Sequence, residues 1–484
     1  MQVNPDFIKR LRRICGEAVI SEPERLKVYE TDGLTAKRQV PPVVVLPETV
    51  RQVQQVAALC HQHGVPLVAR GAGTGLSGGA MPHSDGVLLG LSKFNKVLNV
   101  DPDARTARVQ PGVTNLAITE AVKGLGLYYA PDPSSQIACT IGGNVAENSG
   151  GVHCLKYGLT VHNVRKLSVV SPEGELYEVG SDALDAPGYD LLALMHGSEG
   201  LLGIVVEVTV NLLPRPDDIC VVMASFDAVS HAGDAVGAII AAGILPAGLE
   251  MMDNPAIRAA EAFVGAGYPV EAQALLLVEL DGTRDEIDAQ LAALEEVLAA
   301  HQAANVRVAF DEAERARFWQ GRKAAFPAVG RIAPDYYCMD GTIPRRALAD
   351  VLVAISEMGQ RYGLGVANVF HAGDGNLHPL ILYDANKPGE VERAEAFGAD
   401  ILTLCIEKGG TITGEHGVGV EKIDQMCVQF SEAELTVFHG VKAAFDPTGI
   451  LNPGKAVPTL HRCAEFGAMH VHAGQEKFPD LERF

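Results

Sequence analysis

The stretch that decides the fold is Arg70-Gly-Ala-Gly-Thr-Gly-Leu-Ser-Gly-Gly79, which follows a short apolar segment at Pro66–Ala69. It holds five glycines in the nine residues 71–79. Glycine lets the backbone approach an anion closely, and successive N–H groups then form a concave anion site. A tight turn between strands needs only one or two glycines, so this density favours a phosphate cradle. Thr74 and Ser77 can add hydroxyl donors to it.

The same stretch does not fit a dinucleotide-binding Rossmann loop. Gly73-Thr-Gly-Leu-Ser-Gly78 has the spacing GxGxxG, but a Rossmann loop must open a helix whose N-terminus meets the pyrophosphate. Here Gly79-Ala-Met-Pro82 follows, and then Ser84-Asp-Gly86, so we expect no helix after the loop. The sequence therefore disfavours NAD at this site.

An α/β pattern surrounds the loop. Val43–Leu46 and Pro66–Ala69 are predicted to be buried strands, and Thr49–His63 between them has the apolar spacing of a helix. Two further glycine-rich sections follow, at Ile141–Gly158 and Gly197–Ile204.

The chain is too long for a single core, and Pro214 and Pro216 mark a first boundary. Beyond it, strands alternate with Ala-rich helices such as Arg284–Ala304. We expect four parts. They are a helical lead at 1–40, a cofactor-binding domain at 41–216, a substrate domain at 217–425 that carries the histidine motifs, and a segment at 426–484 that returns to the cofactor domain.

A second concentration of chemically active side chains lies at His371-Ala-Gly-Asp-Gly-Asn-Leu-His378 and at Gly414-Glu-His-Gly-Val-Gly419. A hairpin that turns at Gly373–Asn376 would bring the two histidines side by side, whereas one straight strand would place them on opposite faces. Two histidines and the carboxylate of Glu415 are a recurrent ligand set for Zn²⁺, Fe²⁺ or Mn²⁺. The alternative is a set of hydrogen-bonded histidines in polar turns.

The composition excludes several classes of partner. Lys+Arg 39 against Asp+Glu 60 gives a net charge of -21, which repels phosphate backbones, so no nucleic acid is expected. The nine cysteines are scattered without a CxxC pair. This favours reduced thiols in the cytoplasm and leaves no ligand cluster for an iron–sulfur centre. The longest apolar run, Val236–Leu249, is interrupted by Gly243 and Pro246, so no membrane span is expected.

The glycine sections resemble the FAD-binding domain of the vanillyl-alcohol oxidase / p-cresol methylhydroxylase superfamily. The resemblance rests on the loop at 70–79, on Gly142-Gly-Asn144 and on Gly203-Ile204. It implies an α+β fold with a two-lobed FAD-binding domain and an α+β substrate (cap) domain with an antiparallel sheet. Members with covalent flavin often carry a histidine where this chain has Thr74, so non-covalent FAD is implied. The FAD-binding residues implied are Arg70, Gly71, Ala72, Gly73, Thr74, Gly75, Ser77, Gly78, Gly79, Pro131, Asp132, Ser135, Gly142, Gly143, Asn144, Asn148, Gly150, Gly203, Ile204 and Asn452.

The histidine motifs are similar to signatures of the D-2-hydroxy-acid dehydrogenase branch, which includes D-lactate, D-2-hydroxyglutarate and glycolate dehydrogenases. In that branch the residues matching His371, His378 and Glu415 ligate a divalent metal, and the residue matching His416 is the catalytic base. Arg322 matches the substrate-binding arginine, although from the residues alone it could equally be a surface arginine. A similarity to the FAD-binding chains of bacterial glycolate oxidase (glycolate dehydrogenase) complexes spans essentially the whole sequence.

Oxidation of a 2-hydroxy acid requires a held carboxylate, a base for the hydroxyl proton, a hydride acceptor and a stabilised alkoxide. The planar guanidinium of Arg322 suits binding of the carboxylate, and the imidazole of His416 suits removal of the proton. The flavin ring would accept the hydride, and a divalent metal would stabilise the alkoxide. The 2-hydroxyglutarate enzymes carry Lys where Cys338 aligns and Asn where Leu380 aligns, and both would serve a distal carboxylate. Their absence predicts a small substrate, with glycolate going to glyoxylate and D-lactate to pyruvate.

Reduced flavin must then pass its electrons on. With no cysteine cluster and no NAD site, the acceptor is O2 or a partner protein. The resemblance implies an iron–sulfur subunit and a second flavin-type subunit of a glycolate oxidase complex, in the cytoplasm and at the inner membrane only through those partners. Three alternatives stay open: a D-2-hydroxy-acid dehydrogenase acting alone, a metal-dependent hydrolase of a phosphorylated substrate, and a flavin-carrying scaffold. The metal and the preferred acid are not fixed by the sequence.

Overall fold

The computed structural model describes residues 3–183, 188–459 and 462–463, which form two compact units. The first unit comprises Met1–Gly150, Leu159–Pro214 and His416–Phe484, and the second comprises Gly151–Gly158 and Arg215–Glu415. The second unit thus ends at Glu415, whereas the sequence placed the end of the substrate domain at 425. The reason is that the next residues bond to the first unit: the amides of Val420 and Glu421 both donate to the carbonyl of Ser77.

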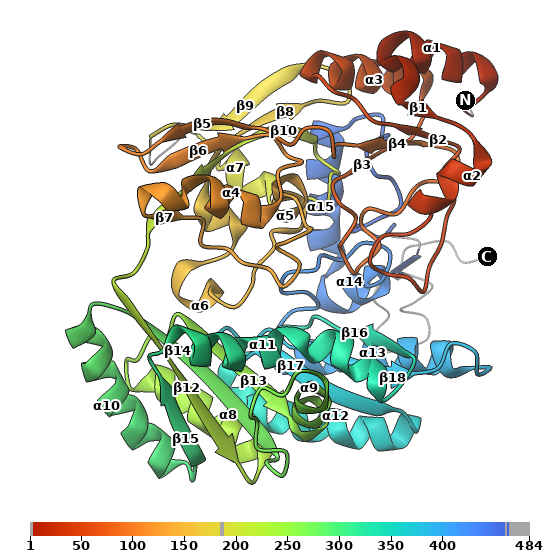
Figure 1. Cartoon of the computed structure of the whole chain (residues 1–484). Helices are drawn as coiled ribbons and strands as arrows, with labels where there is room; N and C mark the ends of the chain where they lie inside the picture. The colour runs from red at the N-terminus through yellow and green to blue at the C-terminus, as the bar shows by residue number, and fades with distance from the viewer. Residues whose placement is uncertain (1–2, 184–187, 460–461, 464–484) are drawn as a thin grey trace. The chain divides into compact units, whose positions relative to one another are not determined.

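The first unit is built on two sheets (Figure 1). One has four strands in the order β1-β2-β4-β3, with β2, β4 and β3 parallel, and the other has five antiparallel strands in the order β5-β6-β10-β8-β9. A short pair joins β7 (Leu127–Tyr128) to β11 (Leu213–Pro214). The strands are β1 Val19–Ile20, β2 Val43–Val45, β3 Leu67–Arg70, β4 Val87–Gly90, β5 Val97–Asp101, β6 Thr106–Val109, β8 Val164–Val170, β9 Leu176–Gly180 and β10 Ile204–Asn211.

Local sequence explains the helix that precedes the glycine loop. α3 (Val50–His63) is capped at its N-terminus by Thr49, whose side chain forms a capping box with Gln52, and at its C-terminus by Gly64 in the left-handed conformation. This agrees with the predicted limits. Its apolar face packs into a core that also receives Leu451 from the C-terminal segment. The other helices of this unit are α1 Pro5–Cys15, α2 Pro23–Leu26, α4 Asn115–Val122, α5 Ile141–Glu147, α7 Leu191–Met195, α14 Ile423–Gln429 and α15 Glu432–Phe445.

The second unit contains one seven-stranded antiparallel sheet in the order β15-β12-β14-β13-β17-β18-β16. Its strands are β12 Asp218–Phe226, β13 Gly248–Asp253, β14 Ala274–Gly282, β15 Ala304–Ala309, β16 Asp335–Cys338, β17 Gly365–His371 and β18 Pro379–Tyr383. Its helices are α6 Cys154–Tyr157, α8 Val229–Ala241, α9 Asn254–Val264, α10 Arg284–Ala300, α11 Glu312–Ala328, α12 Leu348–Tyr362 and α13 Glu390–Glu407. This is the α+β arrangement with an antiparallel sheet that the sequence predicted.

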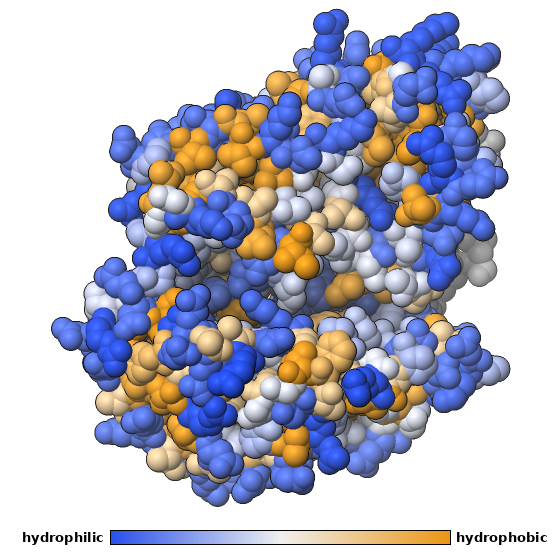
Figure 2. All heavy atoms as spheres, in the orientation of Figure 1, coloured by the Kyte–Doolittle hydropathy of each residue, from blue (hydrophilic) through white to orange (hydrophobic). Residues whose placement is uncertain are grey.

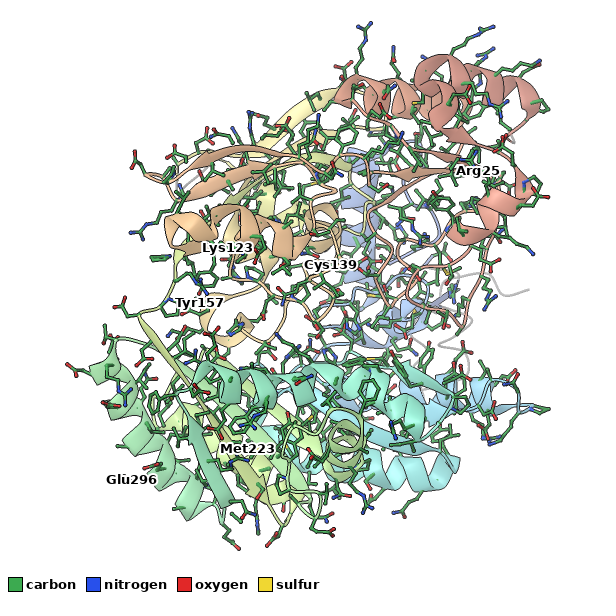
Figure 3. The ribbon with its side chains drawn as sticks, viewed as in Figure 1. Arg25, Lys123, Cys139, Tyr157, Met223 and Glu296 are labelled. Atoms are coloured by element: carbon green, nitrogen blue, oxygen red, sulfur yellow. A yellow bond between two sulfur atoms is a disulfide. The ribbon has the colours of Figure 1, made fainter. Side chains whose placement is uncertain are left out.

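The helices of the second unit pack on its sheet in two groups, α10–α8–α12–α13 and α9–α11. Figure 3 labels Met223 of β12, which is buried, and Glu296 of α10, which is exposed. α10 ends at Ala300, four residues before its predicted end, because Ala304 already begins β15.

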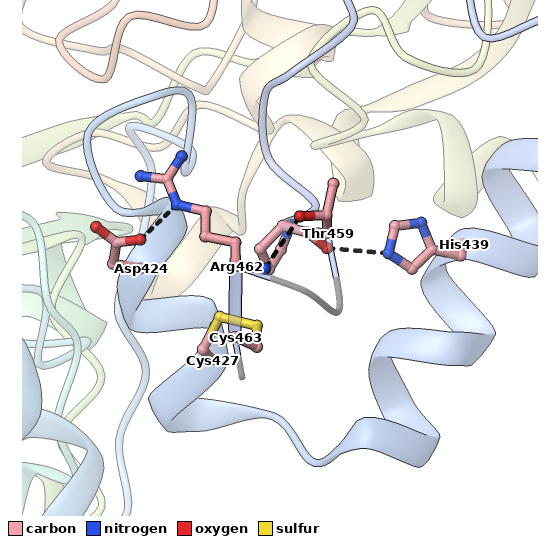
Figure 4. The surroundings of a disulfide bond; sticks show 7 residues. Asp424, Cys427, His439, Thr459, Arg462 and Cys463 are labelled. Carbon is pink, nitrogen blue, oxygen red and sulfur yellow. Dashed lines mark hydrogen bonds and ion pairs between the residues drawn. A yellow bond between two sulfur atoms is a disulfide. The ribbon is translucent and has the colours of Figure 1, made fainter. Parts of the chain in front are cut away.

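One cysteine prediction is wrong. Cys427 of α14 and Cys463 form a disulfide, with their α-carbons 5.2 Å apart (Figure 4), whereas we expected reduced thiols throughout. The two cysteines are 36 residues apart, so spacing gave no signal. The pair forms because the chain folds back on α14, where Arg462 Nε lies 2.6 Å from an Asp424 carboxylate oxygen.

Hydrophilic residues dominate the face seen in Figure 2, and hydrophobic ones are scattered among them. Some large apolar side chains are nevertheless exposed, such as Tyr189 and Ile137. Among the helices of the described residues, none is both long and apolar enough to cross a membrane.

Candidate active site

The glycine-rich loop leaves β3 and reaches β4 without forming a helix, which confirms the rejection of a Rossmann loop. Gly73 and Gly78 have φ angles of 73° and 80°, in the region that favours glycine. A Cβ atom on Gly79 would lie 2.8 Å from Glu147 Oε1, closer than such contacts allow. The surface that this loop presents to a ligand would therefore consist mainly of backbone atoms.

The second glycine section packs directly on this loop. A Cβ atom on Gly71 would overlap Thr140 Oγ1, and one on Gly142 would lie 2.6 Å from Pro111 Cβ. Thr140 Oγ1 and Asn144 Nδ2 are buried and make no hydrogen bond within the part of the chain that the structure describes. Buried polar atoms normally have partners. These two atoms lie beside backbone positions where only glycine fits. Such an arrangement suits the polar groups of a dinucleotide.

The C-terminal segment joins the first and third glycine sections. Asn452 Nδ2 donates to the carbonyl of Gly79 at 2.9 Å and to that of Glu199 at 2.6 Å. Lys455 Nζ donates to the Gly79 carbonyl at 3.0 Å and also to that of Met81. The predicted residue Asn452 thus lies with the loop at 70–79, and its amide nitrogen fixes two loops to each other.

Other predicted FAD residues have different surroundings. The hydroxyl of Ser77 donates to the carbonyl of His416 at 2.9 Å, and its contact with a phosphate stays a prediction. Gly203 packs on Val169 of β8 and on Tyr177, and Ile204 begins β10. Asn148 Oδ1 accepts the amide of Val161. Pro131, Asp132 and Ser135 lie between β7 and α5, and Gly150 ends the first stretch of this unit.

Sequence reasoning missed a group of buried charges behind the loop. Burial, together with Glu199 and Asp32, raises the pKa of Glu147 well above its usual range. Burial also raises the pKa of Glu199, and it lowers the pKa of Lys455 to about 8. The sequence offered only a weak indication of this group. Glu199 lies between Gly197 and Gly200, and that stretch stands out only for its glycines. Glu199 itself has a φ of 49°.

In the second unit the two histidines lie on one hairpin, as predicted. β17 pairs with β18 so that Asn368 lies opposite Pro379, and the amide of His371 donates to the carbonyl of Asn376 at 3.1 Å. The imidazole centroids of His371 and His378 are 5.1 Å apart. The turn between the strands therefore brings both rings to one place.

The third expected ligand joins them. His378 Nε2 lies 2.9 Å from Glu415 Oε1, and His371 Nε2 lies 3.5 Å from the same oxygen. One ligand atom from each of the three residues lies within 4.8 Å of the others. Two imidazole nitrogens and a carboxylate oxygen that converge in this way are the donor set of a divalent-metal site, so the residues present fit the predicted metal.

Glu250 of β13 is a second residue that the sequence did not reveal. It accepts from Arg322 Nε at 2.7 Å and lies 2.6 Å from His371 Nδ1. This bond directs His371 Nε2 toward Glu415, as carboxylates do behind metal-bound histidines. Burial alone would lower the pKa of His371, but Glu250 and Glu415 together raise it well above its usual range. Burial alone would raise the pKa of Glu415, but the two histidines hold it well below its usual range.

Arg322 is buried in α11, with an exposed fraction of 2%, so the alternative of a surface arginine is wrong. His416 follows Glu415 directly, and the α-carbons of two neighbouring residues are about 3.8 Å apart. The candidate base is thus covalently adjacent to a candidate metal ligand, although Glu415 belongs to the second unit and His416 to the first.

Two family models match this chain, and they cover both units. The model described as "FAD binding domain" matches residues 41–180, and that described as "FAD linked oxidases, C-terminal domain" matches residues 215–456. The chain is 63% identical over 471 residues to the glycolate oxidase subunit GlcD of Escherichia coli (strain K12), which covers 97% of this chain and 94% of the relative. The chain belongs to the FAD-linked oxidase family. It is 32% identical to the D-lactate dehydrogenase of Anaerostipes hadrus, over 94% of this chain and 98% of that one.

This FAD-linked oxidase also has the fold of p-cresol methylhydroxylase, with a TM-score of 0.78 at 18% identity, over 94% of this chain and 97% of that one. The predicted family, the fold class and the FAD-binding domain are therefore confirmed. Membership makes the chain an FAD-linked oxidoreductase and removes the hydrolase alternative.

Proposed function

We propose that this protein dehydrogenates glycolate to glyoxylate, and also D-lactate to pyruvate. The observation that carries the proposal is the cluster of His371, His378 and Glu415 with His416 joined directly to it. The 63% identical relative is named a glycolate oxidase subunit, and a more distant one is named a D-lactate dehydrogenase. Both names describe oxidation of a small 2-hydroxy acid.

Each part of the reaction has a candidate residue. His416 takes the hydroxyl proton, and Arg322, which Glu250 holds in place, binds the substrate carboxylate. His371, His378 and Glu415 hold a divalent ion, Zn, Fe or Mn, which would supply Lewis-acid stabilisation of the alkoxide. FAD, when bound, supplies the hydride acceptor.

Two buried positions on neighbouring strands, Cys338 and Leu380, bear on the size of the substrate. Cys338 of β16 and Leu380 of β18 lie directly opposite each other in the sheet, and both are buried. A buried distal carboxylate would need a charged or strongly hydrogen-bonding partner. The isobutyl group of Leu380 has no donor, and the weak donor of Cys338 is directed to the Met339 carbonyl at 3.4 Å. This pairing supports a substrate with one carboxylate, such as glycolate or D-lactate.

The cofactor is held without a covalent bond, and the electrons leave through a partner. Thr74 cannot form the flavin–histidine link of covalent relatives, so acid precipitation is expected to release all FAD into the supernatant. The cysteines show no iron–sulfur spacing. We therefore propose a complex with an iron–sulfur subunit and a second flavin-type subunit, in the cytoplasm and at the inner membrane through these partners.

The test is anaerobic bleaching of the flavin absorbance near 450 nm, with glycolate, D-lactate, L-lactate and D-2-hydroxyglutarate in parallel. Glycolate and D-lactate are expected to bleach it, and the other two are not. Removal of the metal with a chelator should abolish bleaching, and adding back Zn²⁺, Mn²⁺ or Fe²⁺ should restore it. Bleaching by none of the acids would favour a flavin-carrying scaffold, and fastest bleaching by D-2-hydroxyglutarate would overturn the argument from Cys338 and Leu380.

A further inference from the structure

The segment that carries Glu415 and His416 has no helix or strand of its own, yet its backbone is fixed from both sides. On the side of the second unit, the carboxylate of Asp340 accepts the amides of Gly414 and Glu415, each at 3.1 Å. It also accepts the hydroxyl of Thr413 at 2.5 Å. Asp340 lies two residues after the end of β16 and is fully buried.

On the side of the first unit, Glu199 makes the matching contacts. Its carboxylate accepts the amide of Val418 at 2.6 Å and that of Gly419 at 2.8 Å, and its exposed fraction is 4%. The backbone of Glu199 is itself held, because its amide donates to Ala146 at 2.8 Å and its carbonyl accepts from Asn452.

The carbonyl groups between these amides have partners as well. Ser77 Oγ donates to the His416 carbonyl, and Lys422 Nζ donates to the Gly417 carbonyl, both at 2.9 Å. Gly417 has a φ of 80°, and a Cβ atom there would overlap Glu147 Oε2 and lie 3.0 Å from Glu199 Oε1. The backbone at position 417 lies so close to Glu147 and Glu199 that only glycine fits there.

A carboxylate at each end is a specific chemical choice. A buried charge is costly unless it is fully hydrogen-bonded, so a merely structural loop would be expected to use neutral acceptors. An amide side chain of the same shape has one accepting oxygen, and its NH2 group would face the second backbone N–H. A carboxylate presents an accepting oxygen to each of two amides, as Glu199 does, and charge-assisted bonds are stronger than neutral ones. At Asp340 the Gly414 amide also donates to the backbone carbonyl at 2.9 Å.

We propose that Asp340 and Glu199 are a pair of positioning residues that hold Glu415 and His416 in the geometry of the reaction. Asp340 fixes the backbone of the metal ligand from within the second unit. Glu199 fixes the backbone that follows the base from within the first. The inference rests on the proposed function, because it takes His416 as the base.

The test compares Glu199→Gln and Asp340→Asn with the wild-type holoenzyme. Each should keep its FAD and bind substrate with a similar affinity, while the rate of anaerobic flavin reduction by glycolate falls by about 10- to 100-fold, as expected for a misplaced reacting group. Matched controls are Glu207→Gln in β10 and Asp350→Asn in α12, whose carboxylates are 27% and 77% exposed. Both controls should reduce their flavin at the wild-type rate.

A double mutant separates positioning from general damage. If Glu199 acts through His416, adding Glu199→Gln to His416→Ala should slow flavin reduction little further, because coupled residues are not additive. Fully additive losses would overturn the proposal, and so would unchanged rates in both single variants. Loss of FAD or of folding in both would make the two acids structural and overturn it too. Ser77→Ala, which removes one hydrogen bond to His416, provides a milder variant expected to slow reduction by about fivefold.

A readout without substrate keeps this test independent of the proposed function. Hydrogen exchange of a peptide covering residues 413–420 should accelerate in Glu199→Gln and in Asp340→Asn but not in the two controls. If no acid bleaches the wild-type flavin, the proposed function fails, and the exchange data still show whether the two carboxylates hold the segment. Unchanged exchange in both variants would overturn the positioning role itself.

Discussion

The glycine cradle of the first unit and the histidine hairpin of the second are built in opposite ways. In the cradle the backbone is the functional surface, and side chains are excluded: at Gly71, Gly79 and Gly142 a single added carbon would meet another atom within 2.8 Å. In the hairpin the side chains are the functional surface, and His371 and His378 converge on Glu415. The cradle should therefore be damaged by adding atoms, and the hairpin by removing them.

The largest effect is expected from removing a side chain in the hairpin. His371→Ala deletes one of three converging ligand atoms and leaves Glu250 without a partner on one oxygen. We expect loss of bound metal and a fall in the flavin-reduction rate of about 1,000-fold, or about 4 kcal/mol in the barrier. Metal analysis and stopped-flow absorbance measure both.

The control is His231→Ala in α8, which removes a histidine of the same unit at a distance from the cluster in sequence. It should keep metal and rate. Full metal content in His371→Ala would break the comparison, because the hairpin would then not depend on its side chains.

The next effect concerns the carboxylate that supports the histidine strand. Asp253 accepts the backbone amide of Asn368 on β17 at 2.9 Å and its side-chain amide at 2.8 Å. Burial raises the pKa of Asp253 to about 6, from an ordinary 3.8. The folded state thus binds more protons than the unfolded state between these two values, so its stability falls as pH rises through that window. The fall is about 3 kcal/mol, and it is complete above pH 6.

Chemical denaturation at pH 4 to 7 measures this change. Asp253→Asn cannot titrate, so the stability difference between wild type and variant should decline by that amount as pH rises. Asp234→Asn, at an exposed position of α8, should show no such pH dependence. A pH-independent difference for Asp253→Asn would show that the pKa of Asp253 is the same in the folded and unfolded states.

The smallest effect is expected from adding one carbon to the cradle. Gly142→Ala places a methyl group 2.6 Å from Pro111 Cβ, and overpacking of this kind costs about 1–3 kcal/mol. FAD affinity should fall accordingly, by about 10-fold for each 1.4 kcal/mol, as measured by flavin fluorescence. Gly124→Ala, where an added Cβ meets nothing within 4 Å, should bind FAD normally. Equal affinities in the two variants would mean that backbone closeness at Gly142 does not serve the cofactor.

The same contrast explains what the sequence could predict. Histidine and glutamate are recognisable as possible metal ligands from residue type alone, so the cluster of His371, His378 and Glu415 could be predicted, and the hairpin followed from the glycines between His371 and His378. The limits of α3 followed from Thr49 and Gly64, because caps are local. The five glycines of the first loop indicated only a phosphate-bearing cofactor, and FAD followed from the resemblance of the three glycine sections to a known superfamily.

Residues that act through others had no local signal. Glu250 lies 121 positions from His371, and Glu199 lies 219 positions from Val418, so only the folded chain brings them together. The same holds for the disulfide, where two scattered cysteines gave no pattern. The hydrogen bond from Ser77 to the His416 carbonyl had no signal in the sequence either, because 339 positions separate the two residues.

The bridge between Leu67 and Leu451 also bears on how the protein is made. Leu67 donates to the Ile450 carbonyl at 2.8 Å and accepts from the Asn452 amide at 2.9 Å, beside the first glycine loop. A ribosome synthesises the first glycine loop early and residues 450–455 very late, and the whole second unit is synthesised between them. The hydrogen bonds that Asn452 and Lys455 make to the Gly79 carbonyl can therefore form only after residue 455 has been synthesised. We expect FAD to bind only after translation is complete, and a chain truncated just before residue 450 should be unable to retain it.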